Sequence, residues 1–175
     1  MFEDYLEDTF YFARRGFESE DDRDQVREFR AAVFTAASAL EAFLNYVADG
    51  FEAGDGIEPY ELALLQDRRF ALEQGEFRVL NQTEFRRIED KLRFLLKRFV
   101  PDFNVLTNPI WSHFASFKSL RDDITHPRDT KDLSLKRISD ELPRGINAVI
   151  DLIDLLLSGI YGKRLRPRIR ELRLK

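Results

Sequence analysis

Apolar residues recur at steps of three and four along nearly the whole chain, and no other feature of the sequence constrains its fold as strongly. This spacing places apolar side chains on one face of a helix, where they can pack against neighbouring helices. Four strong series predict helices at residues 24–48, 83–100, 109–126 and 143–162. Weaker series predict short helices at residues 2–13, 60–65 and 134–142. The alternation of polar and apolar residues that would predict a strand is not evident.

Four amphipathic helices joined by loops are typical of an all-α, antiparallel four-helix bundle, here with extra short helices. The length of 175 residues fits a single domain with a substantial core, and we place this helical domain at residues 1–162. The remaining residues, 163–175, are predicted to form a basic C-terminal tail.

The composition excludes several kinds of chemistry. The chain has no cysteine, which excludes a disulfide framework, a thiolate nucleophile and zinc-thiolate sites, and fits a reducing compartment. The spacing of His113 and His126 matches no recognisable metal site, so neither a metal nor a cofactor is expected. Glu3 and Asp4 argue against a signal peptide, and the longest apolar stretch, 146–161, is too short to span a bilayer. We therefore expect a cytoplasmic protein with no membrane partner.

Charge is distributed unevenly between the two ends of the chain. Residues 1–24 hold nine Asp or Glu against three Arg, whereas residues 163–175 hold seven Lys or Arg against one Glu. A basic end permits a local polyanion site on a protein whose net charge is -4. The candidates for RNA backbone contacts there are Lys163, Arg164, Arg166 and Arg168. The alternative is that the two ends are solvated, or pair with each other or with a second subunit.

The segment from Arg121 to Arg128 brings an arginine close to one of the two histidines. Arg121 continues the apolar stripe of the third predicted helix, where an unpaired cation is costly to bury. Pro127 disfavours helical geometry at His126, so the helix should end there. Arginine holds a phosphate in a planar fork of donors at any pH, and histidine exchanges protons near neutral pH. Together, the two side chains can cleave RNA without a metal ion.

A second polar feature supports the first. Glu41 is the only charged residue at positions 31–48, within an otherwise apolar predicted helix. Such a carboxylate requires a cationic partner, and we expect Arg121 to be that partner. Asn45, one helical turn after Glu41, lies on the same face and would complete a small polar network. The alternative is a structural arginine that pairs with Glu41 at a helix end, with His126 as an ordinary turn residue.

The spacing of Arg121 and His126, with Asp122 directly after the arginine, resembles the Arg-x4-His signature of the HEPN family (higher eukaryote and prokaryote nucleotide-binding domains). The segment AASALEAFLNYV, at residues 36–47, resembles the helix that this family places beside its motif. The agreement covers residues 23–162. Family members are typically all-α homodimers whose motifs meet across the two-fold axis, and many are metal-independent endoribonucleases. The resemblance therefore implies a homodimer that cleaves RNA, in a stress, toxin–antitoxin or anti-phage system.

The resemblance also implies a role for each residue of the motif. Arg121 would hold the scissile phosphate and stabilise charge on the five-coordinate transition state. His126 would act as general base on the ribose 2′-hydroxyl, or as general acid at the leaving oxygen. Asp122 would orient a neighbouring group by hydrogen bonding. Such chemistry leaves a 2′,3′-cyclic phosphate and needs no divalent ion.

One position departs from the pattern of the family. In its toxins that are paired with nucleotidyltransferase antitoxins, a tyrosine two residues after the histidine is the modification target. Here that position is Arg128, so inhibition by that route is not expected and Arg128 becomes a candidate phosphate contact. An antitoxin or regulatory protein of another kind is retained as a candidate partner. The alternative functions are a non-catalytic module that binds a nucleotide, RNA or a partner protein, and a purely structural dimer.

Overall fold

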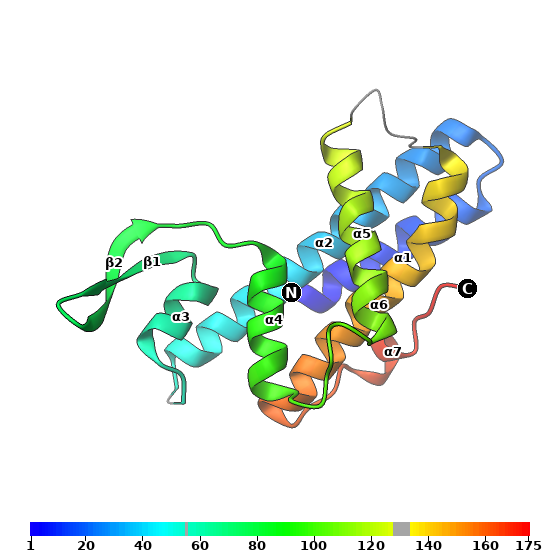
Figure 1. Ribbon diagram of the computed structural model, residues 1–175. Helices are drawn as coiled ribbons and strands as arrows, with labels where there is room; N and C mark the ends of the chain where they lie inside the picture. The colour runs from blue at the N-terminus through cyan, green and yellow to red at the C-terminus, as the bar shows by residue number, and fades with distance from the viewer. Residues whose placement is uncertain (55, 128–133) are drawn as a thin grey trace.

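The structure is a computed structural model that describes residues 1–54, 56–127 and 134–175, and it is mostly helical (Figure 1). Its elements are α1 (Phe2–Glu18), α2 (Asp22–Glu52), α3 (Pro59–Leu65), β1 (Arg68–Glu73), β2 (Glu76–Thr83), α4 (Ile88–Phe99), α5 (Pro109–Thr125), α6 (Leu135–Tyr161) and α7 (Pro167–Arg170). The predicted helical character is confirmed. The all-α prediction broadly fits, with the addition of two strands that pair as an antiparallel hairpin, whereas the four-helix bundle stays a prediction.

Helix α2 is the central element of the fold. It begins after Asp21, whose carboxylate accepts hydrogen bonds from the backbone N–H groups of Arg23 and Asp24. Its apolar stripe, which includes the fully buried Leu40 and Phe43, packs against α1, α5 and α6. α1 runs antiparallel to α2, and α5 and α6 form a second antiparallel pair (Figure 1). The helix predicted at residues 24–48 is therefore confirmed and is longer at both ends.

Helix α2 is also long and apolar enough to cross a membrane, and it alone is so among the described residues. Half of its most apolar window is buried inside the fold. Core helices of water-soluble proteins have the same length and composition, so these properties do not assign α2 to a membrane.

The hairpin is the largest departure from the prediction. It turns at Gln74 and Gly75, whose φ values are 53° and 87°, and it projects from the helices (Figure 1). Every residue of β1 and β2 is described, and none of them is fully buried. Because neither face packs on a core, the alternation that marks a half-buried strand is missing from the sequence. As a consequence, α4 begins at Ile88 and not near Thr83.

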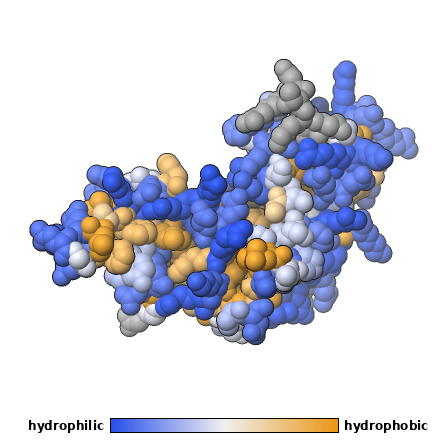
Figure 2. Space-filling view, in the orientation of Figure 1, coloured by the Kyte–Doolittle hydropathy of each residue, from blue (hydrophilic) through white to orange (hydrophobic). Residues whose placement is uncertain are grey.

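Apolar side chains are exposed over the hairpin and α3, while most of the visible face elsewhere is hydrophilic (Figure 2). Tyr60 of α3 packs on the hairpin, with its ring centroid 5.2 Å from that of Phe77 and 6.4 Å from that of Phe70. Leu72 and Phe77, which face each other across the strands, are 64% and 60% exposed. These contacts orient the hairpin relative to α3 without burying it.

Asp67 links the start of the hairpin to α4 through hydrogen bonds and an ion pair. Its carboxylate accepts hydrogen bonds from the backbone N–H of Arg86 at 2.8 Å and from the Lys91 ammonium at 2.7 Å. Its carbonyl oxygen accepts a third, from the N–H of Glu84, at 2.8 Å. Lys91 is only 7% exposed, so the ion pair is largely shielded from water. Asp67 has a φ of 54°, in the left-handed region that Asp and Asn tolerate best among non-glycine residues.

We expect Asp67→Ala to lower the free energy of unfolding by about 2–3 kcal/mol, because it leaves the buried Lys91 ammonium and the Arg86 N–H without their acceptor. Asp67→Asn is the matched control, since asparagine keeps an acceptor and tolerates the left-handed backbone. It should be distinctly more stable than Asp67→Ala in urea-induced unfolding. Equal losses in the two variants would contradict this role of the carboxylate.

Helix α6 corrects a second prediction. The sequence predicts separate helices at residues 134–142 and 143–162, because proline lacks the N–H that continues a helix. These residues instead belong to one helix, with Pro143 in its interior. Leu142, Pro143 and Ile146 are buried together, and this packing offsets the missing hydrogen bond. Close packing with α5 also requires Gly145, because a Cβ atom there would lie 2.7 Å from that of Phe117.

Residues 163–175, predicted as a tail, pack against the helices. Leu165 and Leu174 are 1% and 9% exposed. The N–H of Leu165 donates to the carboxylate of Asp154 in α6 at 2.9 Å. The side-chain amide of Asn147 exchanges two hydrogen bonds with the backbone of Leu174. This basic segment is therefore held on the folded body.

Candidate functional site

A cleft of about 660 Å³ lies between α2, α4, α5 and the connection from β2 to α4. Four of the predicted site residues line it together: Glu41 and Asn45 from α2, and Arg121 and Asp122 from α5. Most of the other lining residues are charged. They are the cations Arg86, Arg87, Lys91 and Lys118 and the anions Asp67 and Glu89. The cleft is thus a highly charged surface in which cations and carboxylates alternate.

Helix α5 positions Arg121 at the edge of the core. The helix begins at Asn108, whose side chain accepts a hydrogen bond from the Ile110 N–H at 2.9 Å, and Pro109 occupies its first turn. One face of α5 is then buried, through Trp111, Phe114, Phe117 and Leu120. Arg121 follows directly after this face, and its side chain is 28% exposed where it enters the cleft.

Two carboxylates orient the Arg121 guanidinium. Its Nη1 donates to Asp122 Oδ1 at 3.0 Å, and its Nη2 lies 3.8 Å from Glu41 Oε1. The predicted contact between Arg121 and Glu41 is therefore confirmed, and it joins α2 to α5. The side chain of Glu41 is 62% exposed, however, so it is not a buried carboxylate that requires a partner. Asn45 is exposed on the same wall of the cleft.

We expect Glu41→Ala to change the free energy of unfolding by less than about 1 kcal/mol, because exposed ion pairs contribute little to stability. Thermal unfolding of the variant beside Glu41→Gln would measure this. A large loss of stability in both variants would instead support the structural alternative, in which the polar cluster fixes the register of the helices.

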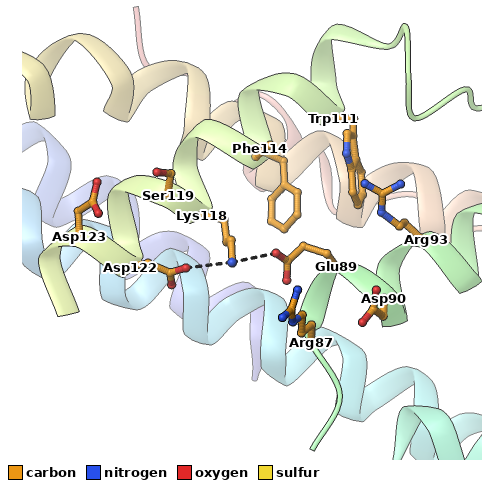
Figure 3. A pocket seen from close by; sticks show the side chains of 11 residues that line it. Arg87, Glu89, Asp90, Arg93, Trp111, Phe114, Lys118, Ser119, Asp122 and Asp123 are labelled. Carbon is orange, nitrogen blue, oxygen red and sulfur yellow. Dashed lines mark ion pairs between the residues drawn. The ribbon is translucent and has the colours of Figure 1, made fainter. Parts of the chain in front are cut away.

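Lys118 extends the ion pairs from α5 to α4. Its ammonium lies 2.9 Å from Asp122 Oδ2 and 3.0 Å from Glu89 Oε1 (Figure 3). The hydrogen bond with Asp122, followed by that with Glu89, raises the pKa of Lys118 above its ordinary value, so the ammonium stays charged. A continuous network thus runs from Glu41 through Arg121, Asp122 and Lys118 to Glu89. Lys118 and Glu89 were not predicted as site residues. The sequence signal that indicates a contact of Lys118 is its i,i+4 spacing from Asp122.

His126 caps the end of α5. Its backbone N–H donates to the carbonyl oxygen of Asp122 at 2.8 Å, and its φ of -126° is the non-helical backbone expected before Pro127. The side chain of His126 is exposed. Among the residues that the structure describes, His126 does not line the cleft. The predicted helix end is confirmed, and the meeting of His126 with Arg121 in one site stays a prediction. Arg128 lies outside the described residues.

A second pocket, of about 430 Å³, continues the cleft along α4 and α5 (Figure 3). Both spaces are lined by Arg87, Glu89, Lys118 and Asp122. The second pocket also includes Arg93, whose guanidinium lies 4.6 Å from the ring centroid of Trp111. An extended ligand would therefore find charged and aromatic groups along the whole groove between α4 and α5.

Phe85 lines the cleft, although the helical periodicity of the sequence predicts that it is buried in the core. Its spacing from Ile88 and Leu92 predicts a place on the buried stripe of a helix. The structure instead places it before α4, where it lines the cleft with its side chain 87% exposed. The exposed ring therefore belongs to the candidate site and not to the core.

The cations near the C-terminus do not line this cleft. Arg164 pairs with Asp154 at 3.1 Å, and Lys163 is exposed. Arg166 pairs with Glu3, and Arg168 pairs with Glu7. The acidic and basic ends of the chain therefore pair with each other, and their carboxylate partners offset the charge that an RNA backbone would meet.

Within the described residues, no group of three or more His, Cys, Asp or Glu side chains is placed to hold a metal ion. No protein-family model, curated protein or solved structure matches this chain. The chemistry of the cleft must therefore be inferred from its own residues. These place an oriented guanidinium, an ammonium paired with two carboxylates and an exposed aromatic ring in one cleft, a combination that can meet an anionic ligand with an aromatic group.

Proposed function

We propose that this protein is a metal-independent endoribonuclease of HEPN type, in which Arg121 holds the scissile phosphate of RNA. One observation about Arg121 carries the proposal. Its side chain is 28% exposed in a charged cleft, and Asp122 and Glu41 orient its guanidinium. A guanidinium that is fixed but not buried can exchange the long contact to Glu41, at 3.8 Å, for a phosphate oxygen.

The proposed reaction is an internal transesterification. The ribose 2′-oxygen forms a bond to the adjacent phosphorus, and the bond from phosphorus to the 5′-oxygen breaks. One His126 accepts the proton of the 2′-hydroxyl, and a second His126 donates a proton to the leaving oxygen. Arg121 stabilises the charge on the five-coordinate phosphorus. The products are a 2′,3′-cyclic phosphate and a 5′-hydroxyl, and no metal ion takes part.

The proposal requires a homodimer, because the motifs of two copies must meet at the two-fold axis for two His126 side chains to act on one phosphate. The exposed face of α2 beside Glu41 is suited to such a contact. Phe34 on this helix is 44% exposed, and Glu41 is the only charged residue at positions 31–48. In this proposal α2, α4, α5 and α6 correspond to the four-helix bundle of the family.

We further propose that the enzyme acts in the cytoplasm, in a stress, toxin–antitoxin or anti-phage system. Expression of an unrestrained endoribonuclease harms the cell that makes it, so an antitoxin or regulatory protein is the expected partner. RNA is the expected substrate. Arg128, whose position is outside the described residues, is retained as a candidate phosphate contact.

The second candidate function is a non-catalytic module that binds a nucleotide, RNA or a partner protein in the same cleft. The observation that favours it is the position of His126, which does not line the cleft within the described residues of one chain. This candidate predicts that RNA binding depends on Arg121 and that no RNA is cleaved.

Cleavage of a mixed RNA pool in EDTA, measured over a range of protein concentrations, tests the proposal. Sedimentation at the same concentrations gives the fraction of dimer. A composite site predicts cleavage without divalent ions, at a specific rate that falls as dimers dissociate. A strict need for added metal, or full activity in the monomer, would contradict the proposal, and binding without cleavage would support the second candidate.

A further inference from the structure

Phe85 is unusual among the lining residues of the cleft. It is an aromatic residue whose side chain is 87% exposed, and it lines the same cleft as Arg121 and Lys118. Single exposed apolar residues are common on protein surfaces, so exposure alone does not indicate a function. The surroundings of Phe85 give the further evidence.

The backbone on both sides of Phe85 is fixed. The N–H of Glu84 donates to the carbonyl oxygen of Asp67, and the N–H of Arg86 donates to its carboxylate, each at 2.8 Å. Asp67 is itself held by the nearly buried ammonium of Lys91 at 2.7 Å. The backbone that carries the ring is therefore ordered before a ligand binds.

Among the described residues, five cations and four carboxylates line the cleft, so most of its cations are paired. Arg86 and Arg87 follow Phe85 directly in the sequence, and both line the cleft with Arg121 and Lys118. Among the described residues, Arg87 makes no ion pair with a carboxylate, so its charge is available to a ligand. Cations that track a phosphate backbone, next to an aromatic ring on which a base can stack, are the arrangement by which proteins bind single-stranded nucleic acid.

We propose that Phe85 stacks on an unpaired base of RNA while the neighbouring phosphate lies against Arg121. The substrate is then single-stranded RNA, because the bases of a duplex are already paired and stacked on one another. This inference rests on the proposed function for its choice of RNA as the ligand. It adds the strandedness of the substrate and a residue that positions it.

Fluorescence anisotropy with a short labelled single-stranded RNA of mixed sequence tests the inference. The protein carries His126→Ala and is kept in EDTA, so that the probe stays intact. Phe85→Leu should raise the dissociation constant about tenfold, as expected for the loss of one base stack, and Phe85→Trp should preserve binding. Phe77→Leu is the matched control, because Phe77 is 60% exposed on the hairpin but does not line the cleft. It should change the constant by less than about twofold.

Several outcomes would overturn the inference. These are undetectable binding of the RNA, an unchanged dissociation constant in Phe85→Leu, or equal affinity for the same RNA annealed to its complement. Dissociation of a dimer by Phe85→Leu, seen by sedimentation, would assign the ring to a protein contact instead. If wild-type protein never cleaves RNA but binding depends on Phe85, the inference stands and the proposed function fails. If wild-type protein cleaves RNA but binding is independent of Phe85, the proposed function stands and the inference fails.

Discussion

Replacement of Arg121 by alanine is expected to slow RNA cleavage by roughly 10²–10³-fold, the loss typical of removing one preorganised donor to transition-state charge. The effect on folding should be small, because Arg121 is 28% exposed and its partner Glu41 is 62% exposed. Asp122 keeps its ion pair with Lys118, and Glu41, which loses its cation, is exposed to water. Single-turnover cleavage rates in EDTA and urea-induced unfolding of the same samples would measure the two effects.

Two matched variants separate charge from geometry at this position. Arg121→Lys keeps the positive charge but not the planar fork of donors, and we expect only partial recovery of the rate. Lys97→Ala removes an exposed cation of α4 that lines neither pocket, and the rate should not change. If Arg121→Ala and Glu41→Ala both unfold at much lower temperature than the wild type, Arg121 is a structural arginine.

Replacement of His126 by alanine is expected to lower the cleavage rate by roughly 10²–10⁴-fold, the contribution typical of a positioned general acid or base. Stability should be unaffected, because the side chain is exposed and the contact that ends α5 comes from its backbone N–H. RNA affinity should also persist, since Arg121 still holds the phosphate. Cleavage rates, thermal unfolding and RNA binding by the same preparation would measure these three effects.

His113→Ala is the control for His126→Ala. His113 lies on the same helix, α5, and does not line the cleft among the described residues, so its loss should leave the rate unchanged. A His126→Ala variant that cleaves at the wild-type rate would remove this histidine from the mechanism. Loss of the dimer in His126→Ala would give the residue a structural role instead.

The sequence predicts the fold best where burial determines structure. The stripe around Leu40 and Phe43 is fully buried, so it keeps a clear helical period, and α2 could be predicted. The hairpin could not, because its strands are exposed on both faces, which removes the alternating signal. Pro143 indicates a helix boundary on local grounds, whereas tertiary packing of its neighbours keeps α6 continuous.

Part of the candidate site could also be predicted from the apolar faces of the helices. Arg121 and Glu41 each follow directly after a buried residue of an apolar face, and helices that pack by those faces bring the residues at their edges together. The contacts of Lys118 with Glu89 and of Lys91 with Asp67 depend on where the hairpin and α4 lie, which no local pattern specifies. The exposure of Phe85 has the same origin, because α4 begins after it.

The most direct test of the central claim is the chemistry of the RNA ends left by wild-type protein in EDTA, compared with those left by His126→Ala. The proposed mechanism predicts a 2′,3′-cyclic phosphate on one fragment and a 5′-hydroxyl on the other, formed by the wild type and not by the variant. Ends with a 3′-hydroxyl and a 5′-phosphate would contradict it, because water and not the ribose would then be the nucleophile. Cyclic phosphate formed equally by both proteins would contradict the assignment of His126.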